Sequence, residues 1–356
     1  MKKYLTLFSS FFVMLSLGGV YAWSIFSTEL MLKYNWSSTQ TQLVFGTLIA
    51  VFPVTMIFAG KKAQKNNVRI YGILSALFFS SGYILSGVSG GNFYVVLFGI
   101  GVLAGIGTGF GYLTSITVPV KWFPQKKGLI TGVIAAGFGL AAVILSSFTE
   151  ILLNQGNNVL KIFILIGIIY GLIIFTFSLF IYYPQKNNII PEKIEIISFL
   201  KNNSFYKLVL GIFLGTFAGL LVIGSLKPIG FEYNISNHHL AIAVSVFALS
   251  NFTGRLVWGF LSDFFDGDFT IFLSLLFQSV FILLISNSNL ESSQFIYISA
   301  GIGFGFGANF VLFAKETSHK FGIDRLSAIY PYVFLGYAFA GIFGPLTGGI
   351  LYDINN

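Results

Sequence analysis

The sequence contains no cysteine, few charged residues and only three histidines. Of its 356 residues, 9% are charged and 55% are hydrophobic, whereas a soluble globular protein carries about 25% charged residues. The lack of cysteine excludes disulfides and thiolate metal sites. The histidines have no metal-ligand spacing with carboxylates in an apolar run, so we expect neither a metal nor a cofactor. These absences favour a polytopic membrane protein.

Long apolar runs fill most of the chain. A helix needs about 20 predominantly apolar residues to cross a bilayer, and we count eleven such runs. The first follows Met1-Lys2-Lys3 and continues to Phe26 without a small-residue cleavage site, so we interpret it as a span and not as a signal peptide. The predicted spans are 4–28, 41–60, 68–89, 92–119, 127–153, 158–183, 205–230, 238–262, 269–287, 294–315 and 325–352.

Positive charge lies in alternate loops, while the opposite loops, such as 89–92 and 286–294, have few or no basic residues. By the positive-inside rule we expect a multi-pass protein of the plasma (cytoplasmic) membrane with a cytoplasmic N-terminus. The net charge of +8 then reflects contact with membrane lipid and not with nucleic acid. The basic loop residues are Lys2, Lys3, Lys61, Lys62, Lys65, Arg69, Lys121, Lys126, Lys127, Lys186, Lys193, Lys201, Lys207, Lys315, Lys320 and Arg325.

A glycine-rich block occurs twice. Residues 105–111 read GIGTGFG, and residues 301–307, which lie 196 positions later, read GIGFGFG. Small residues let membrane helices approach closely, so the repeat predicts two copies of one helical bundle. The polar segment 184–204 divides them, giving a six-helix bundle over 1–183, a cytoplasmic linker and a five-helix bundle over 205–356. The offset places a twelfth span near residue 354, so we expect one peripheral helix to be missing.

Four stretches resemble the oxalate/formate antiporter family of the major facilitator superfamily. The longest of them is GIGTGFGYLTSITVPVKWFPQKKGLITGVIAAGFG, residues 105–139, with its KWFP block. The others are 19–26, 251–263 and 341–345. The resemblance implies an all-α membrane fold of the major facilitator type, with two bundles around a site that opens alternately to each side. It also implies a small organic anion as substrate.

The sequence departs from that family at three places. In the loop after the second span Gly60 is kept, but Gln64 replaces the usual acid and Asn67 the usual second glycine. In the second half Gly259 and Asp263 fit the pattern, and the basic residues that usually follow are absent. Oxalate-carrying members have a lysine in the eleventh span, and here that position is Tyr337. The resemblance assigns gating to Gly60, Gly259, Asp263, Lys121, Lys126 and Lys127.

Arg255 is the first candidate for substrate binding. It lies eight positions before Asp263 and seventeen after His238, which is roughly 12 Å inside the apolar layer at about 1.5 Å per residue. A charge there costs at least ~2.5 kcal/mol, so Arg255 should face the bundle interior. Its planar guanidinium can donate two parallel hydrogen bonds to a carboxylate there. The alternative is a structural arginine that binds backbone carbonyls or Asp263, or that reaches the interface. Asn251, one turn earlier, could bind the anion or orient the guanidinium.

Other polar side chains inside the spans are weaker candidates. Substrate contact or helix packing would explain each of them: Tyr21, Trp23, Tyr112, Asn309, Tyr332 and Tyr337. We predict no buried Asp or Glu that could relay protons, which favours exchange or facilitated movement of an anion. A nucleotide-binding role for the glycine blocks would need a strand–turn–helix context, and both blocks lie inside spans.

The sequence thus predicts a monomeric secondary transporter or exchanger of small organic anions and not an enzyme, because no acid–base or nucleophilic pair lies within the bilayer. One cation balances one charge, so we expect monocarboxylates of the formate, lactate or pyruvate type. The alternatives are a dicarboxylate antiporter of the oxalate/formate type, a carrier of neutral or cationic solutes, and a non-transporting sensor or degenerate paralogue.

Overall fold

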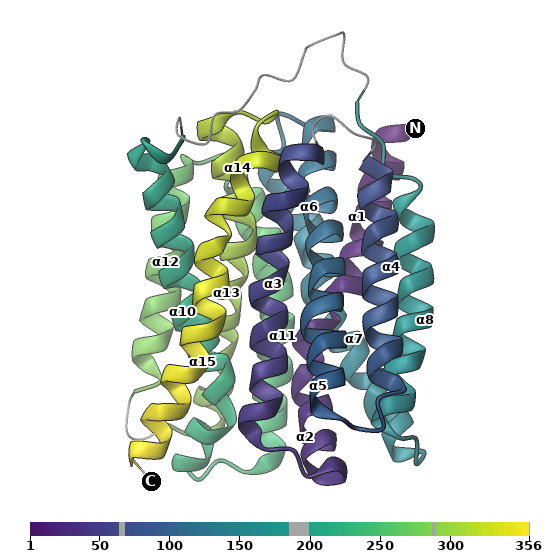
Figure 1. The fold of residues 1–356 in the computed structure, drawn as a ribbon. Helices are drawn as coiled ribbons and strands as arrows, with labels where there is room; N and C mark the ends of the chain where they lie inside the picture. Colours follow the sequence, from purple (N-terminus) through teal and green to yellow (C-terminus); the bar gives the residue numbers. More distant parts are fainter. Residues whose placement is uncertain (64–67, 185–198, 287–289, 356) are drawn as a thin grey trace.

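The computed structural model describes residues 1–63, 68–184, 199–286 and 290–355, and these residues form helices that lie side by side (Figure 1). The helices of the first half are α1 (Lys2–Leu17), α2 (Trp23–Tyr34), α3 (Ser38–Ala63), α4 (Val68–Gly87), α5 (Phe93–Val96), α6 (Gly105–Trp122), α7 (Lys127–Asn154) and α8 (Val159–Ser178). Those of the second half are α10 (Asn203–Glu232), α11 (Asn237–Leu261), α12 (Gly267–Leu284), α13 (Ser292–Phe321), α14 (Leu326–Val333) and α15 (Leu335–Asn355). The chain is therefore an all-helical, multi-pass membrane protein.

Eleven helical stretches among the described residues are long and apolar enough to cross a membrane. Several are composite. A 3-10 turn over Gly18–Ala22 separates α1 from α2, and a π-helical segment over Leu97–Ala104 joins α5 to α6. In the last span Pro331 has no N–H to donate, and the helix is interrupted at Phe334, between α14 and α15. Two continuous helices predicted from hydropathy, the first and the eleventh, are thus broken near their middle.

The helices pack as two groups. Before the linker, α4 packs on α8 and α6, and α1 packs on α7; after it, α11 packs on α13, and α10 on α15. The groups meet where α7 contacts α11 and where α3 contacts α14 and α15. Figure 1 shows α3 and α11 between the outer helices of the two groups. Residues 185–198 of the predicted linker lie outside the described residues, and the domain boundaries stay a prediction.

The glycines of the repeated block pack against neighbouring helices. A Cβ on Gly109 would lie 2.5 Å from the carbonyl oxygen of Phe52 in α3, and Gly307 lies just as close to the carbonyl oxygen of Asn251 in α11. These two glycines are 198 positions apart and not 196. Because the block has glycine at every second residue, it can be aligned with a shift of two. The contacts between helices, and not the match of the two sequence blocks, identify which glycines of the two halves are equivalent.

We call the end of the helices that carries Lys2, Lys3 and the start of α7 the basic end. The N-terminus lies there, near the top of Figure 1, and the C-terminus lies near the bottom.

Candidate functional site

Arg255 joins the two groups of helices. Its side chain is 0% exposed and reaches from α11 toward α7. Nε donates a hydrogen bond to Oδ1 of Asn251 at 3.1 Å, and Nη1 donates to the backbone oxygen of Ala135 at 2.7 Å. Nη2 has no hydrogen-bond partner among the described residues. Two of the guanidinium nitrogens are therefore held by the protein, and the third has no partner at normal bonding distance, although the Tyr21 hydroxyl lies near the guanidinium.

Aromatic rings surround the guanidinium. Its central carbon lies 4.3 Å from the ring centroid of Phe310 and 5.9 Å from that of Phe138. Ring faces attract a cation, and more strongly where water is excluded. Next to these rings the hydroxyls of Tyr21 and Tyr337 lie 2.9 Å apart, which links α15 to the 3-10 turn after α1. The predicted residues Arg255, Asn251, Tyr21 and Tyr337 thus form one connected group.

Two further tyrosines carry buried hydroxyls that face each other. The Oη atoms of Tyr112 and Tyr330 interact, but neither has a hydrogen-bond partner at normal bonding distance among the described residues. Both rings lie 5.2 Å, centroid to centroid, from the ring of Phe334, and Tyr112 also lies 5.6 Å from Phe138. An unsatisfied buried hydroxyl costs about 1–3 kcal/mol, so this pair of donors is suited to a polar ligand. Sequence reasoning predicted Tyr112 and missed Tyr330.

Three predicted residues have other partners. Nε1 of Trp23 donates to the backbone oxygen of Thr41 at 3.0 Å. The ring of Tyr332 packs at a tilt against that of Phe199, with ring centroids 5.3 Å apart. Asn309 faces α12, where its Nδ2 donates to Oε1 of Gln278 at 3.2 Å. The structure therefore turns these three side chains away from the Arg255 group, and their substrate contact stays a prediction.

At the basic end Asp263 connects the two groups. Its carboxylate accepts hydrogen bonds from the backbone N–H groups of Gly128 at 2.8 Å and Leu129 at 2.9 Å. These groups belong to the first turn of α7, where free N–H donors and the helix dipole favour an anion. Gly259 packs against the backbone of Gly128 with no room for a side chain. Asp263 thus closes the contact between α7 and α11 at this end.

The other predicted gating residues lie nearby. Gly60, near the end of α3, packs against the backbone oxygen of Ser327 in α14. Lys121 lies 4.0 Å from Asp324, Lys126 is exposed, and Lys127 begins α7. Their gating roles stay predictions. The substituted loop positions, Gln64 and Asn67, lie outside the described residues.

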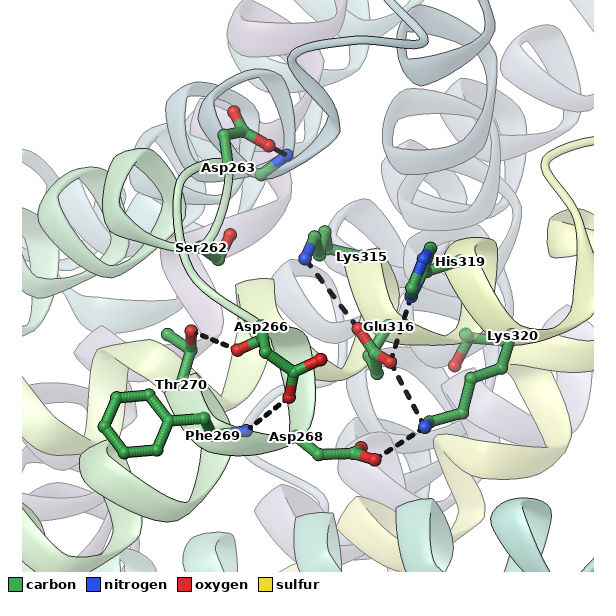
Figure 2. Close-up of polar contacts among 12 residues, drawn as sticks. Ser262, Asp263, Asp266, Asp268, Phe269, Thr270, Lys315, Glu316, His319 and Lys320 are labelled. Atoms are coloured by element: carbon green, nitrogen blue, oxygen red, sulfur yellow. Dashed lines mark hydrogen bonds and ion pairs between the residues drawn. The ribbon is translucent and has the colours of Figure 1, made fainter.

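A second polar network occupies the same end of α12 and α13, as Figure 2 shows. Glu316 is 2% exposed, and its carboxylate lies 3.3 Å from both Nδ1 of His319 and Nζ of Lys320 and 3.8 Å from Nζ of Lys315. Lys320 also bonds Asp268 at 2.7 Å. The expectation that no carboxylate is buried was therefore wrong. The predicted tenth span ends at residue 315, whereas α13 continues to Phe321 and therefore includes Glu316.

Beside that network Asp266 caps α12. Its carboxylate accepts from the N–H of Phe269 at 3.0 Å. That hydrogen bond holds the pKa of Asp266 below its usual value, so the cap stays ionised at neutral pH.

Comparison with known proteins identifies the family. The sequence profile of the Major Facilitator Superfamily matches residues 6–226 and 208–356, which is nearly the whole chain. The chain belongs to the Major Facilitator Superfamily. It is a transporter-type member, and the resemblance inferred from the motifs is confirmed. The carboxylate cap of Asp263 and the buried Arg255 are therefore features of a Major Facilitator Superfamily protein.

Two curated relatives and one solved structure illustrate the match. The chain is 27% identical over 347 residues to the "uncharacterized MFS-type transporter YhjX" of Escherichia coli (strain K12), covering 96% of this chain and 86% of the relative. It is 26% identical over 348 residues to the "oxalate:formate antiporter" of Oxalobacter formigenes, covering 95% and 82%. The Major Facilitator Superfamily transporter FucP, solved in the outward conformation, superposes with a TM-score of 0.57 at 14% identity, covering 94% and 98%. That last likeness concerns the fold alone.

Proposed function

We propose that this Major Facilitator Superfamily protein transports or exchanges small organic anions by alternating access, with Arg255 as the anion-binding group. The observation that carries the proposal is the free Nη2 of a fully buried guanidinium. A buried cation with an unsatisfied donor is costly, and a substrate carboxylate would supply both the missing acceptor and the counter-charge. The printed name of the Oxalobacter relative, an oxalate:formate antiporter, supports an organic anion.

The substrate class follows from the charge of the site. No lysine or arginine follows Arg255 in the second half until Lys315, at the basic end, and none follows Arg325. In the position where the oxalate carriers are expected to have lysine, the neutral Tyr337 bonds Tyr21. One guanidinium balances one carboxylate, whereas a second charge in the low-dielectric interior would lack a partner. We therefore propose monocarboxylates of the formate, lactate or pyruvate type.

Each neighbouring residue has a proposed role. Asn251 orients the guanidinium by accepting from Nε, and Ala135 holds Nη1 from the other group of helices. The hydroxyls of Tyr112 and Tyr330 are the donors for a keto or hydroxyl oxygen of the substrate. Because Arg255 bridges α11 and α7, binding and release of the anion would change a contact between the two groups.

The remaining predictions belong to the same proposal. We place the basic end in the cytoplasm of a plasma (cytoplasmic) membrane, and we expect a monomer with bundles 1–183 and 205–356. Transport and not catalysis is proposed because the curated relatives are named as transporters. Asp263 would then be part of the gate at the cytoplasmic side.

The test is exchange in proteoliposomes. Purified protein is reconstituted into liposomes that contain unlabelled formate, lactate, pyruvate or oxalate. Uptake of the same anions in labelled form is then measured. We expect monocarboxylate exchange in the wild type. Arg255→Gln should weaken substrate binding, measured as the KM of exchange, about 10- to 100-fold, because a hydrogen bond to a charged group contributes about 1.5–3 kcal/mol. Arg255→Lys should retain a part of it, because the charge remains and the bidentate fork is lost.

Lys161→Gln, which removes an exposed cation near the other end of the molecule, is the matched control. Full exchange by a folded Arg255→Gln variant would refute the assignment and favour a neutral or cationic substrate. Oxalate exchange without monocarboxylate exchange would show a dicarboxylate carrier. Binding without any uptake would show a sensor.

A further inference from the structure

Cations and aromatic rings gather at the basic end of α1. Nζ of Lys3 lies 4.8 Å from the ring centroid of Tyr4 and 5.6 Å from that of Phe123. On the other side, Nζ of Lys2 lies 5.7 Å from the centroid of Tyr182, and the Arg69 guanidinium carbon lies 4.5 Å from the same ring. Ring faces support each cation weakly. Three cations are thus held against aromatic rings at the basic end of α1, Lys2 and Arg69 on one side and Lys3 on the other, and their positive charge favours an anion at this end.

An apolar groove begins at the same place. It has a volume of about 290 Å³ and lies between α1 and α7, lined by Tyr4, Leu7, Phe8, Phe11 and Val133. Tyr4 and Phe8 are 60% and 54% exposed, on helices that cross the membrane. The groove therefore faces the bilayer. Tyr4 belongs to both features, since it lines the groove and lies under Lys3.

We infer that this surface is a binding site for one anionic phospholipid. Its headgroup lies over the basic end of α1, where Lys2 and Lys3 supply the positive charge, and one of its acyl chains lies in the groove between α1 and α7. The charge decides the class of lipid, because basic residues at a membrane surface attract anionic headgroups. A zwitterionic lipid brings a cationic choline or ammonium group to the same lysines. Neither the lysines nor the groove contributes to the Arg255 group, so this site is independent of the transport proposal.

The test is lipid retention by the full-length protein. Protein purified in mild detergent is titrated with phosphatidylglycerol or phosphatidylcholine, and bound lipid is counted by native mass spectrometry. We expect one phosphatidylglycerol to bind before any other lipid. The double variant Lys2→Gln/Lys3→Gln should weaken that first binding about 30-fold, which corresponds to about 1 kcal/mol for each lysine.

A second variant tests the groove without changing charge. Val133→Trp fills the groove and should reduce the first binding at least about tenfold, because an acyl segment of a few CH₂ groups loses its apolar contacts there. Lys201→Gln/Lys207→Gln, which removes two lysines from the same end of the other half, and Ile144→Trp, on the other half of α7, are the matched controls. Both should bind as the wild type does.

Three results would overturn the inference. The first is equal retention of phosphatidylcholine, and the second is equal weakening by the control lysine pair. The third is unchanged binding by the Val133→Trp variant, which would show a charged surface without an acyl-chain site. Because the lysine variant could insert into the membrane incorrectly, the groove variant, which retains all charges, keeps the test decisive.

Discussion

Replacing Asn251 by aspartate separates a substrate-binding role of Arg255 from a structural one. The Asn251 Oδ1 atom accepts from Arg255 Nε at 3.1 Å, so Asn251→Asp would place a carboxylate directly on the guanidinium. If Arg255 is structural, the new ion pair strengthens an existing contact and transport is retained. If Arg255 binds the substrate, the introduced charge competes with the substrate for the guanidinium.

The size of the effect can be estimated. Nε and Nη2 point from the same edge of the guanidinium, so a substrate carboxylate on Nη2 would lie beside the introduced one, with roughly 7 Å as the upper end of their charge separation. At an effective dielectric constant of about 20 the repulsion at that separation is about 2.4 kcal/mol, which corresponds to roughly 60-fold weaker binding. Asn251→Ala removes the same hydrogen bond without adding a charge, so its KM should rise much less.

The assay is the KM for formate or lactate exchange in proteoliposomes at two pH values. We expect a large rise in KM for Asn251→Asp at both pH values, because the adjacent guanidinium keeps the introduced carboxylate ionised and the repulsion persists. Thermal unfolding of each variant controls for folding. A wild-type KM for a folded Asn251→Asp variant would refute the reasoning and leave Arg255 as a packing residue.

Three further predictions concern the gate and the selectivity of the site. Asp263→Asn should weaken the cap on α7 and favour opening at the basic end. The opening would be seen as faster maleimide labelling of a single cysteine introduced at that end, because the sequence has no cysteine of its own. Unchanged labelling, or an equal increase for the control Asp266→Asn, would contradict a gating role. Tyr337→Lys should add the second cation and raise oxalate uptake relative to formate uptake, and no change in that ratio would argue against the charge-matching argument. Tyr112→Phe and Tyr330→Phe should each raise the KM for pyruvate or lactate about 10-fold or more and leave the KM for formate almost unchanged, because only the larger anions have an oxygen beyond the carboxylate. An equal change in KM for all substrates would indicate a packing role.

The sequence alone determined the fold, the family and the central arginine. Long apolar runs require helices, since a membrane offers no other partner to the backbone. A charge far inside an apolar span must face the interior, and Arg255 does. These conclusions depend on local composition and on position along one helix, which a sequence contains in full.

Which side chains share a site was decided by the tertiary structure. Tyr330 in α14 and Tyr337 in α15 both pack against the ring of Phe334, whereas Tyr332 is turned by about 200° from Tyr330 and packs at a tilt against Phe199. The helix periodicity in the sequence contained that signal. It could not show that Asn309 faces Gln278, that Glu316 is buried, or that the glycine blocks match at 198 positions, because each of these depends on which neighbouring helix a face meets. Contacts between distant segments are set by packing, and a residue's own stretch of sequence does not specify them.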